Sequence, residues 1–257
     1  MAAYETILVD RAPPIATITL NRPEARNGIT ARMLDELYAA VTDLAADAEL
    51  RVLVLRGAGR DFCPGADLTA YTAGGQPGND PGAFQVSTVL HESHLVSIAA
   101  IKGACAGAGF GWACACDLRI CDDTARFNTA FLDVGISGDM GGPWLLSRIV
   151  GGAKARELYF LPGKFSAHEA ERIGLVTRLV PELEFEEEVR DLAERLANAA
   201  PLALRAMKAN FVDSERLGLA DFIAAETARH SECGRSEDSR EAFRAFVEKR
   251  KPLFQGR

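Results

Sequence analysis

The sequence predicts an α/β fold that is followed by a region built only of helices. Over about the first 195 residues, short apolar segments typical of strands alternate with segments whose apolar residues recur at helical spacing. From Glu184 the pattern is helical almost to the end, with breaks at Pro201 and Gly234. We therefore expect a core over residues 1–197 and a helical region over residues 198–257. The repeated order of strand, turn and helix indicates stacked ββα units.

The elements of the core can be assigned in order. Residues 5–10 and 15–20 are expected to form a hairpin, with Pro13 and Pro14 in its turn. Apolar residues at helical spacing predict a helix over residues 30–46. Further short apolar strands are expected at residues 51–56, 97–102, 118–121 and 177–180. One helix should follow the glycine-rich residues 103–109 and end at Cys116, and Ser166 with Glu169 forms a capping box that begins another. Residues 69–85 are rich in Gly, Pro and Asn, which predicts a mobile loop.

The composition excludes several classes of protein. A formal charge of −7 argues against a protein that binds nucleic acid by broad phosphate neutralisation. The start of the chain lacks a secretory signal, and no apolar run reaches the roughly 20 residues that a membrane span needs. We therefore expect a cytoplasmic protein. The six cysteines do not have the spacing of metal or redox motifs, so we expect free thiols and no metal site.

Two turns rich in small residues end predicted strands: residues 62–68 (FCPGADL) and residues 103–109 (GACAGAG). Small side chains would let a ligand lie against the backbone N–H groups, and the second turn opens a helix, whose first N–H groups lack partners. One N–H from each turn could form an oxyanion hole. The alternative is that both turns are only tight connections between strand and helix.

The chain resembles the crotonase (enoyl-CoA hydratase/isomerase) superfamily. The resemblance rests on LNRPEARNGIT at 20–30, FCPGADL at 62–68, AAIKGACAGAGFGWACACDLRI at 99–120 and GGPWLLSRIVGGAKARELYF at 141–160, with FSAHEAERIGLVTRLVP at 165–181 and EKRKPLF near the end. It implies a spiral of ββα units with a C-terminal helical trimerisation region, so that residues 198–257 join copies into a homotrimer or a dimer of trimers. It also implies acyl-CoA thioesters as substrates, no cofactor, and Ala66 and Ala108 as the oxyanion-hole residues.

The sequence departs from the hydratases of this superfamily at both of their catalytic glutamates, where it has Gly111 and Phe131. Asp139 stands where the isomerase branches place a catalytic aspartate, and the pattern is closest to the single-aspartate enoyl-CoA isomerases. We expect Asp139, between an apolar wall of Phe131, Trp144 and Phe110 and the acyl chain, to have a raised pKa and to act as acid and base. It could instead be only the N-cap of the following helix, and the two roles can coexist.

The resemblance also implies residues that bind the substrate and its coenzyme A. These are Arg22, Ala25, Pro64, Gly65, Asp67, Leu68, Phe131, Trp144 and Lys249. Arg22 and Lys249 would meet the phosphates, and Lys249 could serve the site of a neighbouring subunit. Asp67 is expected to fix its turn by hydrogen bonds to the backbone. We interpret His91 and His94 as packing or surface residues and Asp133 as a solvated acid.

The sequence therefore predicts an enoyl-CoA isomerase that moves a double bond through a thioester enolate. Two alternatives stay open. One is hydration of an enoyl-CoA, with Asp139 activating water. The other is an acyl-CoA-binding protein without catalytic activity.

Overall fold

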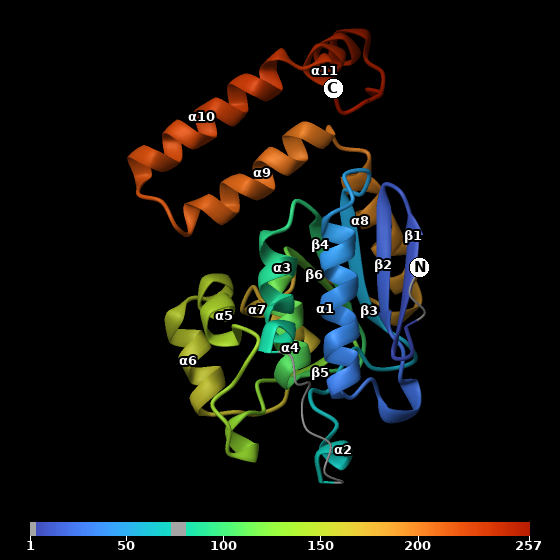
Figure 1. The fold of residues 1–257 in the computed structure, drawn as a ribbon, viewed down its shortest axis with the longest axis vertical. Coiled ribbons are helices and arrows are strands. Elements are labelled where there is room, and N and C mark those ends of the chain that lie inside the picture. The colour runs from blue at the N-terminus through green and yellow to red at the C-terminus, as the bar shows by residue number, and fades with distance from the viewer. Residues whose placement is uncertain (1–3, 73–80) are drawn as a thin grey trace.

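The strands form two sheets in the computed structural model, which describes residues 4–72 and 81–257 (Figure 1). The larger sheet has the order β1-β2-β3-β4-β6-β9. Its strands are β1 (Ile7–Ala12), β2 (Ile15–Leu20), β3 (Val52–Gly57), β4 (Val96–Ile101), β6 (Leu118–Asp122) and β9 (Arg178–Val180). Only the β1–β2 hairpin is antiparallel in this sheet. The smaller sheet consists of β5 (Ala104–Ala106), β7 (Arg126–Asn128) and β8 (Phe165–Ser166).

The chain passes repeatedly from the larger sheet to the smaller one. Strand β4 is followed at once by β5 and then by helix α4 (Gly107–Ala115), and β6 is likewise followed by β7. β5 and β7 pair in parallel, as do β4 and β6. The expected ββα unit is therefore present, and its second strand is the one that the sequence did not predict.

Helices cover both faces of the larger sheet. Leu53 and Leu55 of β3 belong to the main core together with α1 (Ala31–Ala45) and α3 (Val86–Glu92). Val52 and Val54 point to the opposite face and pack with α8 (Phe185–Ala197). A strand buried on both faces is a continuous apolar run, which is why residues 51–56 were recognisable from sequence. The side chain of Thr30 caps α1 by accepting a hydrogen bond from the N–H of Met33.

Short helices complete the core. They are α2 (Leu68–Thr72), α5 (Gly142–Val150), α6 (Gly152–Phe160), α7 (Ala167–Arg172), and the single 3₁₀ turns Pro23–Ala25, Pro81–Gln85, Leu132–Val134 and Glu182–Glu184. The prediction of a loop over residues 69–85 is wrong at both ends, where α2 and the turn Pro81–Gln85 are helical. The part of that loop at residues 73–80 lies outside the described residues.

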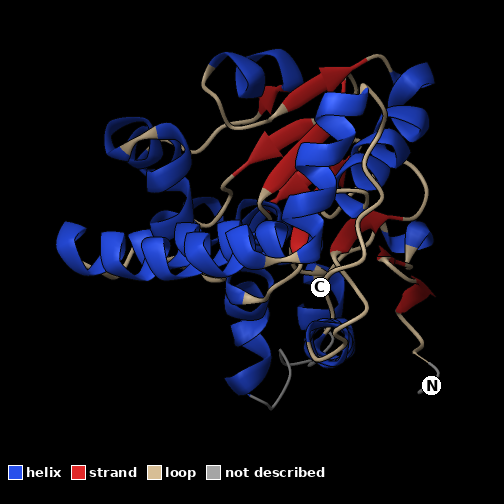
Figure 2. Cartoon of the chain, turned by 90° about the horizontal axis from the view of Figure 1, so that it is seen from above, coloured by secondary structure: helices blue, strands red, loops and turns tan. Residues whose placement is uncertain are grey.

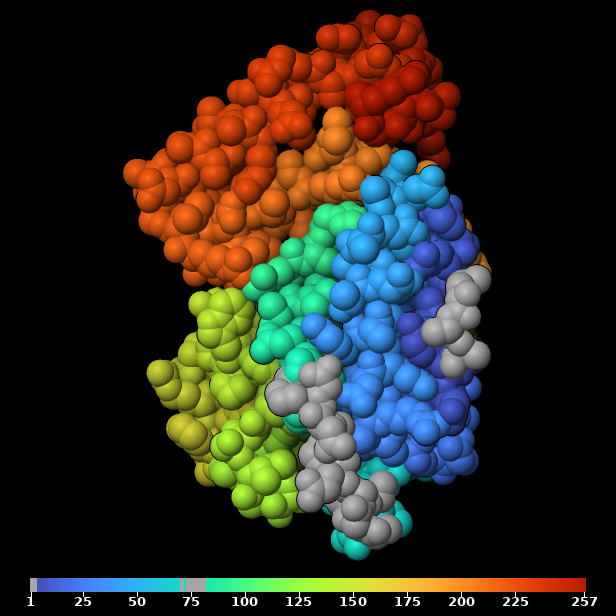
Figure 3. Space-filling view, viewed as in Figure 1, coloured from blue at the N-terminus to red at the C-terminus, as the bar shows by residue number. Residues whose placement is uncertain are grey.

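The last three helices form a lobe that projects from the core (Figures 1, 2 and 3). They are α9 (Pro201–Ser214), α10 (Leu219–Arg235) and α11 (Glu237–Glu248). α9 is fixed to the core by Lys208, whose buried Nζ lies 2.6 Å from Oδ1 of Asp117. α10 buries no residue. The helical pattern of the sequence predicted these helices.

Within the described ranges, no helix is both long and apolar enough to cross a membrane. All six cysteines are free, five of them buried and Cys233 half-buried. Burial raises the pKa of the Cys63 thiol to about 12, so this group stays protonated and inert at neutral pH. Among residues 4–72 and 81–257, no cluster of His, Cys, Asp and Glu has the arrangement of a metal site.

Candidate active site

The two glycine turns are joined by backbone hydrogen bonds. The N–H of Cys63 donates to the carbonyl of Ala104, and the N–H of Ala106 donates back to the carbonyl of Cys63, both at 2.9 Å. The first turn is held on its other side by Ile29, which exchanges bonds of 2.9 Å with the carbonyl of Gly65 and the N–H of Asp67. A Cβ on Gly65 would lie 3.2 Å from the carbonyl oxygen of Ala106, so the turns approach more closely than larger residues allow.

The N–H groups of Ala66 and Ala108 take no part in these bonds. Neighbouring groups of the first turn are paired, but the N–H of Ala66 donates none of the bonds that link the turns. Ala108 is the second residue of α4, so its N–H has no acceptor within the helix. Ala66 is exposed and Ala108 is 7% exposed. Two fixed amides of this kind are suited to bind a carbonyl oxygen that gains negative charge.

Asp139 lies in a strained loop before α5. Gly138, Met140 and Gly141 all have positive φ angles, of 107°, 51° and 67°. The N-cap of α5 is Gly141, and no side chain caps this helix, so the interpretation of Asp139 as an N-cap is wrong. Its Oδ1 is buried and has no hydrogen-bond partner among the described residues. Burial raises the pKa of Asp139 to about 6, which suits a general base near neutral pH.

Met140 brings this loop against α4. A Cβ on Gly111 would lie 2.6 Å from the Cβ of Met140, so the methionine occupies the space beside Gly111. Gly111 lies one turn beyond Ala108 on the same face of α4. The Asp139 loop is thus held close to the helix start that presents the Ala108 amide.

The second position that differs from the hydratases is also filled by an apolar side chain. Phe131 is buried and stacks on Tyr159, with ring centroids 6.3 Å apart. The hydroxyl of Tyr159 is buried without a partner in the described part of the chain, and burial, with Cys114 and Asp139 nearby, raises its pKa. Phe110 does not join this wall, because it packs edge-on against Phe127 and Phe165 instead.

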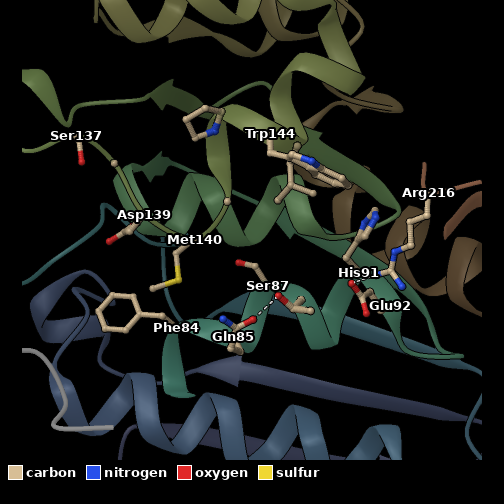
Figure 4. A pocket seen from close by; sticks show the side chains of 15 residues that line it. Phe84, Gln85, Ser87, His91, Glu92, Ser137, Asp139, Met140, Trp144 and Arg216 are labelled. Carbon is tan, nitrogen blue, oxygen red and sulfur yellow. Dashed lines mark hydrogen bonds and ion pairs between the residues drawn. The ribbon is translucent and has the colours of Figure 1, made fainter. Parts of the chain in front are cut away.

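A cavity of about 570 Å³ opens beside Asp139 (Figure 4). Of the residues predicted to form the site, Asp139 and Trp144 line it. The rest of its wall comes from the turn Pro81–Gln85, α3, the loop before α5, α5 itself and Arg216 after α9. Phe84, Ser87, His91, Met140 and Leu145 are among the lining residues that the sequence analysis did not assign to the site. The other predicted residues lie outside this lining.

The end of the cavity near α9 is aromatic and charged. The ring of His91 meets Trp144 edge-on at 5.6 Å, and the guanidinium of Arg148 lies 3.5 Å from the centre of the indole. Nε2 of His91 is 2.8 Å from the Glu215 carboxylate. His94 lies apart and bonds the carbonyl of Leu50, as a packing residue does. The expectation that His91 is only a packing residue is therefore incomplete, since it also lines the cavity.

The residues expected to bind coenzyme A lie in two separate places, around the first glycine turn and at the end of α11. Nη2 of Arg22 is 3.0 Å from Oδ2 of Asp67, and Arg22 also donates to the carbonyl of Gly28, so Asp67 is held by a side chain. Ala25 is half-buried in the same segment, and Leu68 is 56% exposed at the start of α2. Pro64 lines a second cavity of about 620 Å³.

Lys249 is exposed at the end of α11, at the opposite end of the long axis from α2 (Figure 1). Within one chain it cannot join Arg22, so a shared phosphate site needs a second copy.

Asp133 is exposed, as expected. The segment is a 3₁₀ turn, and the side chains of Leu132 and Val134 are about half exposed.

The spiral of ββα units, with two linked glycine turns beside a buried acid, defines the class as the crotonase fold. The family model for enoyl-CoA hydratase/isomerase matches residues 10–257, and the chain belongs to this family. A probable enoyl-CoA hydratase from Rhodobacter capsulatus is 38% identical, with 99% of this chain and 100% of the relative covered. The carnitinyl-CoA dehydratase of Salmonella typhi is 35% identical, with 98% and 99% covered.

The crystal structure of an enoyl-CoA hydratase from Bacillus anthracis superposes with a TM-score of 0.91, at 31% identity and with 98% of this chain and 100% of that chain covered. The similarity supports the processing of acyl-CoA thioesters. The names of these relatives give hydratase or dehydratase, so the isomerase branch stays a prediction.

Proposed function

We propose that this protein is an enoyl-CoA isomerase in which Asp139 is both the base and the acid. The observation that carries the proposal is the buried Oδ1 of Asp139 at the edge of a substrate-sized cavity. This oxygen has no partner among the described residues, and the pKa of the group is raised. Asp139 would remove a proton from the carbon beside the thioester carbonyl. The negative charge would move to the carbonyl oxygen, where the N–H groups of Ala66 and Ala108 stabilise it.

The reaction ends when protonated Asp139 returns its proton at the γ carbon, so that the double bond moves by one position. Each step transfers a proton, and the proposed reaction therefore needs neither a metal nor a redox cofactor. Coenzyme A enters only as part of the substrate. One carboxylate suffices because the same group removes the proton and later returns it.

Hydration is the second candidate, favoured by the names of the relatives. It would require Asp139 alone to activate water, because Gly111 and Phe131 carry no acid. The space beside Gly111 is occupied by Met140, which counts against a water held there between two carboxylates.

The exposed apolar residues of the C-terminal lobe support the proposed homotrimer, or a dimer of such trimers. Half of the large apolar side chains that are exposed among the described residues lie beyond residue 200, including Phe243, Phe246 and Val247, which are 71–85% exposed. Apolar surface of this extent is typical of contacts between subunits. A neighbouring copy would also supply Lys249 to the phosphate site expected at Arg22.

Substitution of the acid tests the function. Asp139→Asn is expected to lower kcat for the conversion of a 3-enoyl-CoA into a 2-enoyl-CoA by about 10²–10⁴-fold, because proton transfer by a placed side chain contributes this much. The absorbance of the conjugated product gives the rate, and calorimetry gives the affinity, which should be unchanged. In the native chain kcat/KM should rise with pH through about 6, as Asp139 loses its proton.

Asp133→Asn is the matched control, since it removes an exposed carboxylate from the same loop and should leave the rate unchanged. Full isomerisation by Asp139→Asn would contradict the proposal. Binding without turnover of any enoyl-CoA by the native chain would favour a binding protein, and hydration without isomerisation would favour the second candidate.

A further inference from the structure

Ser87 is a buried hydroxyl that the proposed reaction does not use. It is the second residue of α3, is 6% exposed and lines the cavity beside Asp139. Its Oγ has no hydrogen-bond partner among the residues that the structure describes. A buried hydroxyl without a partner destabilises the fold, so it calls for an explanation.

The other polar side chains on this wall are already paired with each other. Thr88 donates to Oε1 of Gln85 at 2.7 Å. Arg216 forms an ion pair with Glu92, and His91 lies 2.8 Å from Glu215. The charges at this end of the cavity are thus balanced within the protein. Of the α3 hydroxyls that line the cavity, Ser87 is therefore the one left to meet a ligand, and a neutral oxygen suits it better than an ionised group.

The position of Ser87 relative to the acid fixes where that oxygen would lie. In Figure 4 its hydroxyl points toward Met140, whose side chain lies between Ser87 and Asp139. Asp139 and Ser87 both line the same cavity, from the loop before α5 and from α3. Met140 has an unbranched, flexible side chain that can move aside for an acyl group. An oxygen at Ser87 would therefore be carried by the acyl chain beyond the carbon that Asp139 serves.

We propose that Ser87 donates a hydrogen bond to a neutral oxygen of the acyl group, a hydroxyl or a carbonyl, so that the preferred substrates are oxygen-bearing acyl-CoA thioesters. This inference rests on the proposed function, because it assumes that the acyl chain occupies the cavity beside Asp139. Ser87 acts here as a specificity-determining residue and takes no part in proton transfer.

Two ligands that differ by one oxygen test the inference. The dissociation constants of hexanoyl-CoA and 5-hydroxyhexanoyl-CoA, whose hydroxyl lies beyond the γ carbon, are measured by calorimetry on the full chain carrying Asp139→Asn, which prevents turnover. The hydroxylated ligand should bind about tenfold more tightly, since one neutral hydrogen bond is worth up to about that factor. Adding Ser87→Ala should abolish the preference, whereas adding Ser147→Ala, which removes an exposed hydroxyl on α5, should preserve it.

A second measurement separates binding from packing. Ser87→Ala should unfold at the same or a higher temperature than the native chain, because its hydroxyl stabilises nothing within the protein. A lower unfolding temperature with an unchanged affinity ratio would assign Ser87 to packing and overturn the inference. Slower hydration of crotonyl-CoA by Ser87→Ala, again with an unchanged ratio, would place a water at Ser87 and also overturn it.

The inference and the proposed function fail in different ways. Equal affinities for the two ligands in the Asp139→Asn chain would remove the role of Ser87 and leave the function untouched. If neither ligand binds, the cavity does not take acyl-CoA, and the proposed function fails as well.

Discussion

The turn that presents Ala108 and the loop that carries Asp139 adjoin the candidate site and differ in construction. In the turn, backbone groups of residues 63, 104 and 106 bond each other, and every residue of α4 is buried. In the loop, Met140 is a non-glycine residue with a positive φ angle, and Oδ1 of Asp139 lacks a partner among the described residues. The comparison teaches that the proposed oxyanion hole depends on the main chain, whereas the proposed proton transfer depends on a side chain.

The largest expected effect is on the stability of the turn. A Cβ on Gly109 would lie 2.6–2.7 Å from the carbonyl oxygen, Cβ and Sγ of Cys63, which the linked turns hold in place. Gly109→Ala should therefore lower the free energy of unfolding by about 3 kcal/mol, as overpacking of a rigid core does. Urea unfolding followed by circular dichroism measures it.

Gly135→Ala is the counterpart in the loop. Gly135 has a φ of 74° and open space around its would-be Cβ, so the change should cost only about 1 kcal/mol of backbone strain. Equal losses in the two variants would show that the turn is no more rigid than the loop, and would break the comparison.

A smaller effect should appear where the two regions touch. Gly111→Ala places its Cβ against that of Met140, and Met140→Gly removes that obstacle. In a double-mutant cycle the two changes should couple by about 2 kcal/mol, because alanine becomes favourable in the helix once the clash is gone. Additive losses would mean that Met140 does not fill the space beside Gly111.

The smallest expected effect is the pH dependence of stability that Asp139 contributes. Its carboxyl keeps its proton up to about pH 6 in the folded chain, but loses it near its ordinary value when unfolded. The native chain should therefore lose stability as pH rises from about 4 to 6, by about 1 kcal/mol after allowance for partial solvent contact.

Asp139→Asn should lack this dependence, so that its advantage over the native chain grows through the same window and is constant above it. Unfolding midpoints at several pH values give the difference. An advantage that is equal at pH 4 and pH 8 would show that Asp139 has an ordinary pKa.

The sequence predicted the elements that bury continuous or periodic apolar surface, such as β3, β4 and α1. It did not predict β5, β7 and β8, which have two or three residues and no apolar run beside them. The equally short β9 was predicted because it ends the apolar stretch 173–180. The prediction of a loop was wrong for residues 69–72 and 81–85, because Gly, Pro and Asn outweigh a single helical turn. Asp139 stood out by its motif, but Ser87 and His91 could not, since only the packing of α3 and α5 on α4 turns them toward the cavity. The position expected for Phe110 was wrong because α4 is buried on all sides, so its apolar pattern does not indicate which side faces the site.

The backbone origin of the Ala66 and Ala108 donors limits how mutation can damage them. Nearly every replacement at either position changes a side chain and keeps the amide hydrogen. Proline alone among the natural residues deletes the donor outright. Substitutions around Asp139 could therefore change the proposed chemistry many times in evolution without removing the two amide donors.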